Sequence, residues 1–388
     1  MQNTKFLALD IGSSVLRLCE VEVEDGRLDI EEYSEVDYSG FSDGQFFDDS
    51  DRLSEVITEL FSDVDTEEYS KVYVNVPSEF CGVYKKDVTQ TFAAPVELNE
   101  LLRRKFLRHA DLEDGEVEGI VIKKILGDFE PHSSTHIDGQ DEQDELTAEV
   151  TYVYVSDDFI DTITSKLAEC GFSDIEFKCG IIEQAHQMLK PHVREAGAVL
   201  IDVGYLTTSV LAVKGEKVES LYSFSLGGAH IVANLSEAFE LPFRVAEQLK
   251  RKVLLTVDPS EVDYYVVSDD ETGKEYELMA SQVNTVVKTK IEHIAKMVAK
   301  CLTEDEYVYQ FAVTGGGLCE MKGALDVFSS ALGVVCKAEN LEMGGLDEFE
   351  QSAIASLIKS SYVSEKEDYQ GLPFYKKWWQ KIVSLFKK

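Results

Sequence analysis

A strand–turn–strand pattern that occurs twice constrains the fold of this chain more than any other feature. Phe6–Leu18 places a bulky apolar run before a short turn and a second apolar run after it, and Ala198–Val213 repeats that order much later in the chain. The turn residues are Asp10, Gly12, Ser13 and Ser14 in the first pattern, and Asp202, Gly204, Thr207 and Thr208 in the second. Apolar runs of this kind predict buried strands, and a glycine in the turn lets the backbone approach a ligand closely. The repeat therefore predicts two lobes of similar design.

The chemistry of these turns suits a nucleotide. Exposed backbone N–H groups cradle phosphate oxygens, and an aspartate such as Asp10 or Asp202 can hold a hydrated Mg²⁺ ion. A third turn, Thr314-Gly315-Gly316-Gly317, follows the mostly apolar run Tyr309–Val313. Each turn taken alone is also compatible with an ordinary hairpin. Two Asp–Gly hairpins together with a late glycine-rich turn predict a nucleotide held between two lobes.

The order and spacing of the three turns resemble the two phosphate motifs and the adenosine motif of the actin-like ATPase superfamily. That superfamily includes actin, sugar kinases, chaperone ATPases and the bacterial cell-division family FtsA. The resemblance implies an α/β, two-lobed actin-like fold of duplicated ribonuclease-H-like domains, with ATP and Mg²⁺ as cofactors. The metal would be held through water by Asp10 and Asp202, and the adenosine would lie at Gly315, Gly316 and Gly317.

Two further segments of the second half fit the same nucleotide. Gly227 and Gly228 precede a predicted helix, where free N–H groups can bind an anion. Glu247 and Lys250 are three residues apart on one face of the next predicted helix. In the resembled family an A-E-x-x-K pattern at this place contacts the ribose and adenine. Without the resemblance, the pair would equally fit a surface ion pair.

The composition argues against several classes of protein. A net charge of −36 argues against nucleic acid as a partner of the body of the chain. The seven cysteines show no C-x-x-C spacing, which argues against a zinc site or a disulfide framework. The N-terminus leads directly into a predicted strand, so no signal peptide is expected. No apolar run approaches the roughly 20 residues of a membrane-spanning helix.

Residues 82–178 contain the insert that favours FtsA within the superfamily. Their periodicity predicts strands near 83–92, 117–126 and 147–155, and helices over 96–109 and 158–170. This block resembles the subdomain inserted into the first lobe of FtsA, and a pilus-assembly relative, PilM, carries a similar insert. The weakly apolar segment 127–145 is expected to be a mobile hairpin loop. The predicted organisation is a first-lobe core at 1–81, the insert at 82–178, and a second lobe with return helices at 179–359 that contains a small subdomain at about 240–305.

Several positions depart from the FtsA pattern. FtsA and the chaperone ATPases place a glutamate at the start of the lobe-connecting helix, near the attacking water; here that position is Gly180, with Glu183 one turn later. Tyr205 and Leu206 stand where the second hairpin of FtsA has consecutive glycines, and Val15 stands where the first has a lysine. A water needs an orienting acceptor within hydrogen-bond reach to attack a phosphate well. We therefore assign no catalytic residue and expect weak or absent ATP hydrolysis.

A long amphipathic helix, predicted over Leu278–Leu302, carries lysines on the face opposite its apolar stripe. In FtsA this lobe binds the C-terminal tail of the tubulin-like ring protein FtsZ, partly through basic residues on such a helix. The resemblance therefore implies a partner site at Lys288 and Lys290. A solvated helix face is the alternative interpretation of these lysines.

The last residues of the sequence reverse the charge of the chain. Residues 360–372 are polar and predict a linker, and residues 373–388 read PFYKKWWQKIVSLFKK. On a helical wheel of about 100° per residue, the apolar side chains fall in one half and the lysines in the other. This pattern is typical of a helix lying in an anionic membrane surface, and FtsA has its membrane-targeting helix at the same end; a docked core helix is the alternative. The predicted membrane contacts are Phe374, Lys376, Lys377, Trp378, Trp379, Lys381, Ile382, Leu385 and Phe386.

The predicted function is that of an FtsA-like adaptor. It would bind ATP, associate with itself as a dimer or filament, and tether the FtsZ ring and other divisome proteins to the cytoplasmic face of the cell membrane at the division septum. Two alternatives stay open. One is a PilM-like ATP-binding scaffold of pilus assembly, which would bind the cytoplasmic tail of an inner-membrane protein. The other is a small-molecule kinase of the same superfamily, although the sequence shows no convincing catalytic base.

Overall fold

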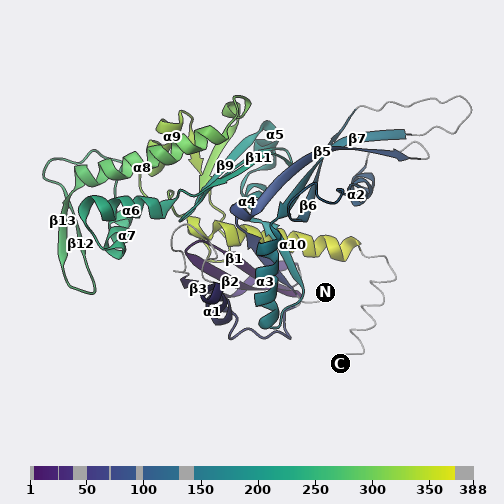
Figure 1. Ribbon diagram of the computed structural model, residues 1–388, viewed down its shortest axis with the longest axis horizontal. Coiled ribbons are helices and arrows are strands. Elements are labelled where there is room, and N and C mark those ends of the chain that lie inside the picture. Colours follow the sequence, from purple (N-terminus) through teal and green to yellow (C-terminus); the bar gives the residue numbers. More distant parts are fainter. Residues whose placement is uncertain are drawn as a thin grey trace, which may run out of the picture.

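The computed structural model describes residues 4–24, 26–37, 50–69, 71–92, 99–130 and 144–371. Two lobes, each built on a five-stranded sheet, lie next to each other, and a three-stranded subdomain extends to one side (Figure 1). Both five-stranded sheets consist of three antiparallel strands in succession followed by two parallel strands. This shared topology confirms the predicted α/β fold of two similar lobes.

The first lobe has the strand order β3-β2-β1-β4-β8. Its strands are β1 (Thr4–Ile11), β2 (Val15–Glu24), β3 (Arg27–Asp37), β4 (Val72–Val76) and β8 (Ile175–Cys179), and its helices are α1 (Ser50–Leu60), α3 (Asp157–Glu169) and α10 (Ser352–Gly371). Leu7 and Leu9 pack with α1 and α3, whereas Phe6 and Ala8 pack with α10 on the other face of the sheet. This alternation is the period of two expected for a strand, and it leaves Asp10 at the end of β1.

The second lobe repeats the arrangement with the order β11-β10-β9-β14-β15. Its strands are β9 (Ala198–Val203), β10 (Thr208–Lys214), β11 (Lys217–Phe224), β14 (Gln310–Thr314) and β15 (Cys336–Ala338). Its helices are α4 (Gly180–Met188), α5 (Pro191–Ala196), α6 (Gly228–Phe239), α7 (Phe243–Lys252), α8 (Ala280–Cys301) and α9 (Ala324–Leu332). A small hairpin of β12 (Tyr264–Ser268) and β13 (Glu275–Met279) lies at the far end of α8 (Figure 1).

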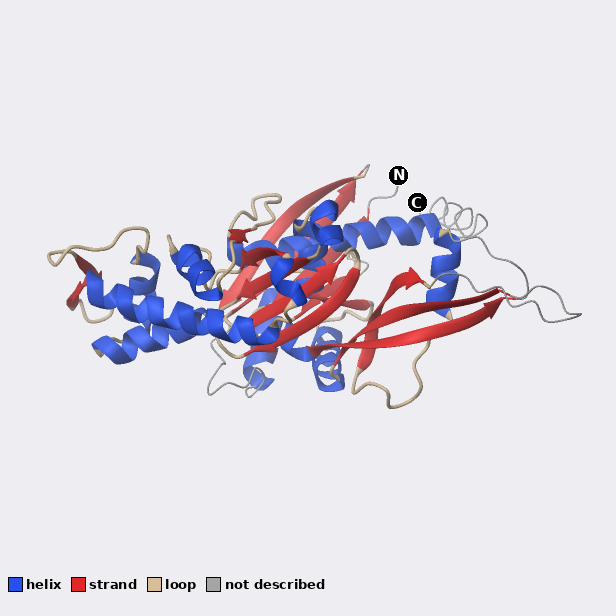
Figure 2. Ribbon diagram, turned by 90° about the horizontal axis from the view of Figure 1, so that it is seen from above, coloured by secondary structure: helices blue, strands red, loops and turns tan. Residues whose placement is uncertain are grey.

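The inserted subdomain is a sheet of order β5-β7-β6 with one helix. Its elements are β5 (Cys81–Phe92), β6 (Ile120–Phe129), β7 (Asp144–Val155) and α2 (Glu100–Arg108), and Figure 2 shows the long strands projecting from the lobes. The last part of the predicted insert, up to residue 178, instead joins the first lobe: α3 packs in its core and β8 pairs with β4. Most of the expected loop, residues 131–143, lies outside the described residues.

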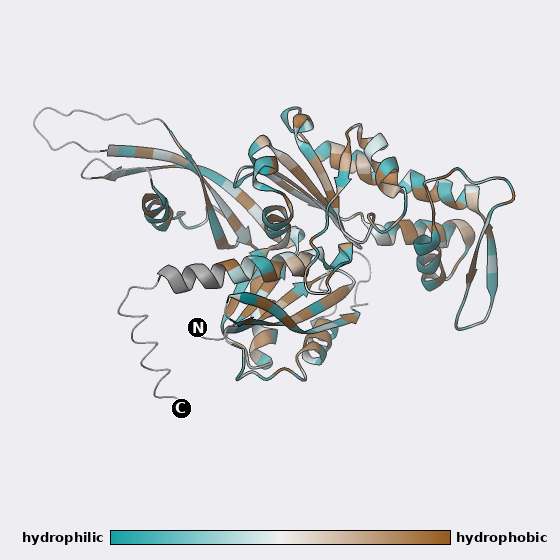
Figure 3. Ribbon diagram, turned by 180° about the vertical axis from the view of Figure 1, so that it is seen from behind, coloured by the Kyte–Doolittle hydropathy of each residue, from teal (hydrophilic) through white to brown (hydrophobic). Residues whose placement is uncertain are grey.

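The packing of each layer follows the sequence pattern. Figure 3 shows hydrophobic residues along the strands of both lobe sheets and of the inserted subdomain. The side chains of Phe6, Tyr73, Phe106, Tyr152 and Phe159 are among the largest that are fully buried. Buried hydrophobic clusters also lie against the sheets of both lobes, so the hairpins between β1 and β2 and between β9 and β10 are built on well-packed sheets.

The segment predicted as a linker is largely helical, so that prediction is wrong. Helix α10 continues through 360–371 because this segment is tied to the first lobe. Ser360 and Ser361 are buried, and the Tyr362 hydroxyl donates a hydrogen bond of 2.5 Å to the Gly26 carbonyl. None of the described helices has the length and apolarity needed to cross a membrane. The predicted membrane helix, residues 373–388, lies outside the described residues.

Candidate functional site

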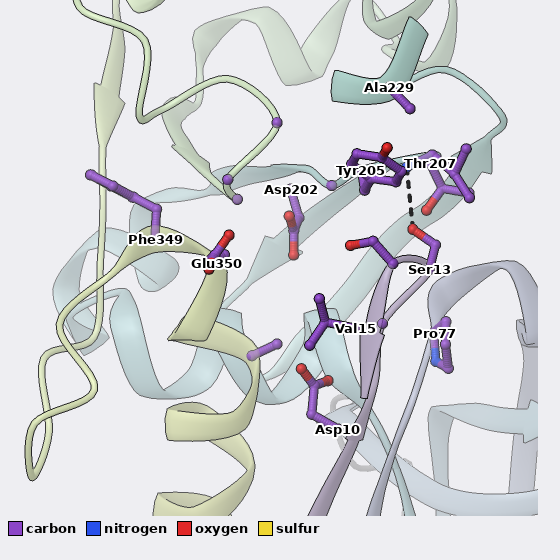
Figure 4. Close-up of a pocket in the computed structure, with 18 of the residues that line it drawn as sticks. Asp10, Ser13, Val15, Pro77, Asp202, Tyr205, Thr207, Ala229, Phe349 and Glu350 are labelled. Atoms are coloured by element: carbon purple, nitrogen blue, oxygen red, sulfur yellow. Dashed lines mark hydrogen bonds between the residues drawn. The ribbon is translucent and has the colours of Figure 1, made fainter. Parts of the chain in front are cut away.

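A cleft of about 1250 Å³ lies between the two lobes and contains both Asp–Gly hairpins. Figure 4 shows Asp10 and Asp202 entering it from opposite lobes, with Ser13 close to the backbone next to Tyr205. Most of the predicted nucleotide residues line the cleft: Asp10, Gly12, Ser13, Ser14, Asp202, Gly204, Thr207, Glu247, Lys250, Gly315, Gly316 and Gly317. Thr208, Gly227 and Gly228 do not line it. The structure thus brings together residues that are more than 300 positions apart in the sequence.

The first hairpin is a tight turn closed by its own backbone. The Gly12 N–H donates to the Val15 carbonyl at 3.1 Å. A Cβ atom on Gly12 would lie 2.6 Å from that carbonyl oxygen, so only glycine fits without movement. The Ser13 hydroxyl oxygen accepts a hydrogen bond of 3.2 Å from the Leu206 N–H, which links the two lobes directly (Figure 4).

The second hairpin is closed in the same way but is bonded to the helix that follows. The Gly204 N–H donates to the Thr207 carbonyl at 2.9 Å. The N–H groups of Gly228 and Ala229 donate to the carbonyls of Gly204 and Tyr205 at 2.9 and 2.7 Å. The first N–H groups of α6 are therefore occupied by protein.

These bonds correct the expected role of the Gly-Gly pair. The Gly227 N–H donates to His230 Nδ1 at 3.1 Å, so neither glycine offers a free donor to an anion. A Cβ on Gly227 would lie 2.6 Å from the Gly204 carbonyl oxygen, and one on Gly228 would lie 2.9 Å from Lys250 Nζ. The pair is glycine because the helix packs closely against the hairpin.

Thr208 also has a structural role in place of the predicted binding role. Its side chain is fully buried, and its hydroxyl donates a hydrogen bond of 2.6 Å to the Leu226 carbonyl. The neighbours Thr207 and Ser209 line the cleft instead. Because side chains alternate along a strand, consecutive hydroxyl residues cannot both face the cleft.

The two aspartates have different electrostatic surroundings. Asp10 is 4% exposed, lies 3.7 Å from Arg17 Nη1 and accepts a hydrogen bond of 2.6 Å from Asn75 Nδ2. Burial raises its pKa, and Arg17 and Asn75 oppose that rise. Burial also raises the pKa of Asp202, to about 6, opposed only by the hydrogen bond of 3.0 Å from Gln184.

The side-chain oxygen atoms of Asp10, Asp202 and Asn75 fit a hydrated cation. The carboxylates of Asp10 and Asp202 are both held in surroundings that raise their pKa, which a positive ion would reverse. Asn75 is 6% exposed, and its Oδ1 atom has no hydrogen-bond partner among the described residues although the side chain lines the cleft. An unpartnered buried acceptor beside two carboxylates suits the water shell of a Mg²⁺ ion.

Arg17 is a cleft residue that the sequence reasoning missed. It is 6% exposed, and besides Asp10 it lies 3.4 Å from a Glu35 oxygen and 3.5 Å from a Glu350 oxygen. It provides a cation near the first hairpin, where Val15 replaces the lysine that is usual in FtsA. An arginine between Leu16 and Leu18 in an apolar strand was the available signal, since a buried charge needs a partner.

The predicted nucleoside end of the cleft is lined by α7 and the glycine turn. Lys250 Nζ lies 3.9 Å from a Glu247 carboxylate oxygen, and burial lowers the pKa of Lys250. The cleft is also lined here by residues that the sequence analysis did not single out, namely Phe243, Arg244, Arg251, Glu320, Phe349 and Glu350. Glu350 reaches this place from the segment before α10, which no local pattern could indicate.

The start of α4 explains the absence of a glutamate there. A Cβ on Gly180 would lie 2.2 Å from Asn75 Oδ1, so the Asn75 side chain occupies the space that a residue at this position would need. Glu183 is buried one turn later, where its carboxylate accepts a hydrogen bond of 2.6 Å from Lys123. It does not line the cleft. A different carboxylate does, from the segment between β4 and β5: Glu79, whose pKa burial raises to about 7.

The predicted partner lysines lie in different places. A groove of about 440 Å³ between α8 and α9 is lined by Lys288, Glu292 and Lys296, and Lys288 Nζ lies 3.2 Å from an Asp258 oxygen. Lys290 is not part of this groove. Burial lowers the pKa of His230, whose side chain lines the cleft, and the charge of Lys290 lowers it further. The structure therefore groups Lys288 with Lys296, not with Lys290.

Comparisons with known proteins agree with this architecture. Residues 199–358 match a family model described as Cell division protein FtsA. No curated protein sequence matches the chain. The solved structure of a PilM-PilN type IV pilus biogenesis complex superposes with a TM-score of 0.57 at 16% identity, covering 92% of this chain and 98% of that chain.

Other solved structures share the fold at similarly low identity. MreB5 of Spiroplasma citri bound to ADP has a TM-score of 0.56 at 11% identity, with 95% of this chain and 99% of that chain covered. The ethanolamine utilization protein EutJ from Carboxydothermus hydrogenoformans has a TM-score of 0.50 at 12% identity, with 92% and 90% covered. The chain has the actin-like ATPase fold, and its second lobe is FtsA-like, which confirms both predictions.

Proposed function

We propose that this chain, an actin-like ATPase fold with an FtsA-like second lobe, is a nucleotide-dependent adaptor that tethers a cytoskeletal ring to a membrane. The observation that carries the proposal is the cleft, into which two Asp–Gly hairpins from opposite lobes each bring one carboxylate whose pKa is raised. A ligand with phosphates and a cation would satisfy both lobes together. The ligand in this proposal is ATP with Mg²⁺.

The charge of the cleft supports a metal-dependent ligand. Bound Mg²⁺ would neutralise phosphate charge and orient the phosphates. Carboxylates outnumber cations in the lining: Asp10, Glu35, Asp37, Glu79, Asp202, Glu247, Glu320 and Glu350, against Arg17, Arg244, Lys250 and Arg251. Free ATP would meet net repulsion here, so nucleotide affinity should depend strongly on Mg²⁺. The MreB5 neighbour was solved with ADP.

The adaptor part of the proposal rests on the family match and the C-terminal sequence. The FtsA match covers the second lobe. There the groove between α8 and α9 presents Lys288 and Lys296 beside Glu292 and Asp326, charges of both signs that suit a peptide of mixed charge, as the C-terminal tail of FtsZ would be. Residues 373–388 carry the lysines and aromatic residues of a surface helix. One such helix anchors reversibly, and self-association would align many of them and raise the avidity. The site of action would be the cytoplasmic face of the membrane at the septum, with other divisome proteins as further partners.

A PilM-like scaffold of pilus assembly is the second candidate. The match to the PilM–PilN structure covers 92% of this chain and 98% of that chain. Such a scaffold would bind the cytoplasmic tail of an inner-membrane protein and would not need a lipid anchor of its own. A small-molecule kinase is the third, and phosphoryl transfer to a small acceptor would establish it.

Co-sedimentation with vesicles tests the tether. The intact chain and a chain that ends at Leu372 are mixed with vesicles of phosphatidylcholine and phosphatidylglycerol, with and without ATP and Mg²⁺. We expect the intact chain to pellet, ATP with Mg²⁺ to strengthen pelleting, and the shortened chain to stay in the supernatant. A matched chain with Lys376→Glu and Lys381→Glu keeps the length and should also stay in solution. Pelleting of the shortened chain would contradict the tether.

Peptide binding separates the first two candidates. An FtsZ C-terminal tail peptide should bind the adaptor, and Lys288→Glu with Lys296→Glu should weaken it at least fivefold because both lysines line the groove. Lys300→Glu is the matched control, since Lys300 lies on the same helix outside the groove. Binding of a PilN cytoplasmic peptide without FtsZ-tail binding would favour the pilus scaffold.

A further inference from the structure

Glu79 occupies a position in the cleft that the proposed function does not yet use. It lies in the single 3₁₀ turn Ser78–Phe80, directly after β4 and Pro77 and directly before β5. Its side chain lines the cleft from the first lobe, at the point where the chain enters the inserted subdomain. Pro77, which Figure 4 shows at the edge of the cleft, limits the backbone freedom of this turn. The glutamate is therefore held in place by the strand before it and the strand after it.

The carboxylate of Glu79 reaches across to the second lobe. Glu79 and Thr207 both line the cleft. Burial and the charge of Asp202 raise the pKa of Glu79, and hydrogen bonding to Thr207 opposes that rise. Thr207 is the last residue of the second hairpin, whose carbonyl closes the turn with the Gly204 N–H. Glu79 therefore lies at the phosphate end of the cleft, next to the backbone donors of that hairpin.

Asp10 and Asp202, the carboxylates of the two hairpins themselves, are engaged elsewhere. Asp10 is held by Arg17 and Asn75, and Asp202 accepts from Gln184. At the start of α4, the Asn75 side chain fills the space beside Gly180, so a carboxylate cannot enter from that side. Among the described cleft residues, Glu79 is the carboxylate that combines access to the phosphate end with a hydroxyl partner on the opposite lobe.

We propose that Glu79 is the catalytic residue of a slow ATP hydrolysis, in which its carboxylate, held by Thr207, orients the water that attacks the terminal phosphate. This inference rests on the proposed nucleotide-binding function. It replaces the expectation from Gly180 that no orienting acceptor exists: the acceptor comes from the segment between β4 and β5 instead of from α4. Glu79 and Thr207 come from opposite lobes, so hydrolysis would require the two lobes to stay together as they are in this structure.

The reaction balances without a further reagent. The water oxygen forms a bond to the γ-phosphorus while the bond from that phosphorus to the β–γ bridging oxygen breaks, which leaves ADP. The water donates one hydrogen bond to Glu79 and passes a proton to an oxygen of the departing phosphate. The products are ADP and inorganic phosphate, and Glu79 ends in its starting state. Orientation of a water by one side chain contributes roughly ten- to a thousandfold to such a rate.

Single-turnover phosphate release from the intact protein loaded with ATP and Mg²⁺ tests the proposal. Glu79→Ala should slow release at least tenfold, and Glu79→Gln, which keeps one acceptor oxygen and the shape, should fall between that variant and the unchanged protein. Both variants should bind a non-hydrolysable ATP analogue within about twofold of the unchanged protein, because Glu79 orients water and does not hold the nucleotide. Glu59→Ala is the matched control, since Glu59 is an exposed glutamate on α1 of the same lobe.

The following results would count against the proposal or against the proposed function on which it rests. Release at an unchanged rate from Glu79→Ala, or no phosphate release from the unchanged protein, overturns the proposal. So does a loss of analogue affinity in Glu79→Gln with an unchanged rate per bound ATP, which would make Glu79 a binding residue. If the unchanged protein does not bind the analogue, the proposed function itself fails, and the binding measurement shows this separately. A crystal structure with the analogue should place a water within hydrogen-bond distance of Glu79 and Thr207.

Discussion

The two Asp–Gly hairpins have the same backbone and different surroundings. In each, the glycine N–H bonds to a carbonyl three residues later. The first aspartate, Asp10, is paired with Arg17 and bonded to Asn75, whereas Asp202 has a single amide partner, Gln184. The first lobe therefore balances its charge internally, and the second leaves its carboxylate for something in the cleft to balance. Equal turns can serve different parts of one ligand because their neighbours differ.

The largest difference should appear when the two aspartates are neutralised. Asp10→Asn leaves the buried Arg17 without its buried carboxylate partner, since Glu35 and Glu350 are largely exposed, and we expect it to lower the free energy of unfolding by about 3 kcal/mol. Asp202→Asn should raise that free energy by up to about 2 kcal/mol at pH 8 in the ligand-free protein. Chemical denaturation of both variants measures the two changes, and equal signs would contradict the comparison.

The pH dependence checks the cause of the second change. Burial raises the pKa of Asp202 from 3.8 to about 6, so the folded state binds the proton more tightly than the unfolded state. Stability of the unchanged protein should fall as pH rises through this window, since the cost of ionisation is present above it and absent below it. The advantage of Asp202→Asn should therefore vanish near pH 4. At both pH 8 and pH 4, Asp202→Asn should lose Mg²⁺-dependent nucleotide binding.

A smaller contrast should separate the two hairpin glycines. A Cβ on Gly12 would lie 2.6 Å from the Val15 carbonyl oxygen, while one on Gly204 would lie 3.2 Å from the Thr207 carbonyl oxygen. We expect Gly12→Ala to cost about 2 kcal/mol of unfolding free energy and Gly204→Ala less than about 1 kcal/mol, because the closer contact forces the backbone to move. Thermal unfolding of the ligand-free variants gives the values. A larger cost at Gly204 would show that the second turn is the more rigid one.

The smallest effect concerns the direct link between the hairpins. Ser13→Ala removes the acceptor of the Leu206 N–H and should lower the free energy of unfolding by about 1 kcal/mol. Ser14→Ala in the same turn is the control and should change stability by less than about 0.5 kcal/mol. If the two substitutions lower the free energy of unfolding equally, the effect comes from changing the turn and not from losing the hydrogen bond between the lobes.

Several features of this protein could be predicted from sequence because they depend on neighbouring residues. Apolar runs, the Asp–Gly turns and helical periodicity gave the strands, the hairpins and most helices, including α7 and α8. The match of two distant hairpins gave the two-lobed fold. Short motifs were sufficient to predict the fold, because the spacing between these motifs in the sequence depends on the fold.

Other features depended on contacts that no local pattern records. The polar segment 360–371 looked like a linker, yet it is helical because its serines are buried and Tyr362 bonds to Gly26. Gly227 and Gly228 were expected to donate hydrogen bonds to an anion, yet their N–H groups donate to other groups of the protein. Polarity along a sequence does not tell which groups have protein partners.

The sequence by itself determined the two hairpins, the two-lobed fold and the position of the cleft. Only the tertiary structure decided which side chains complete that cleft: Arg17 beside Asp10, Asn75 in the space of Gly180, and Glu79 opposite Thr207. The physical reason is that a turn is specified by backbone preferences over a few residues. The charge and hydrogen bonding of a site are instead set by side chains that meet only after both lobes have folded and come together.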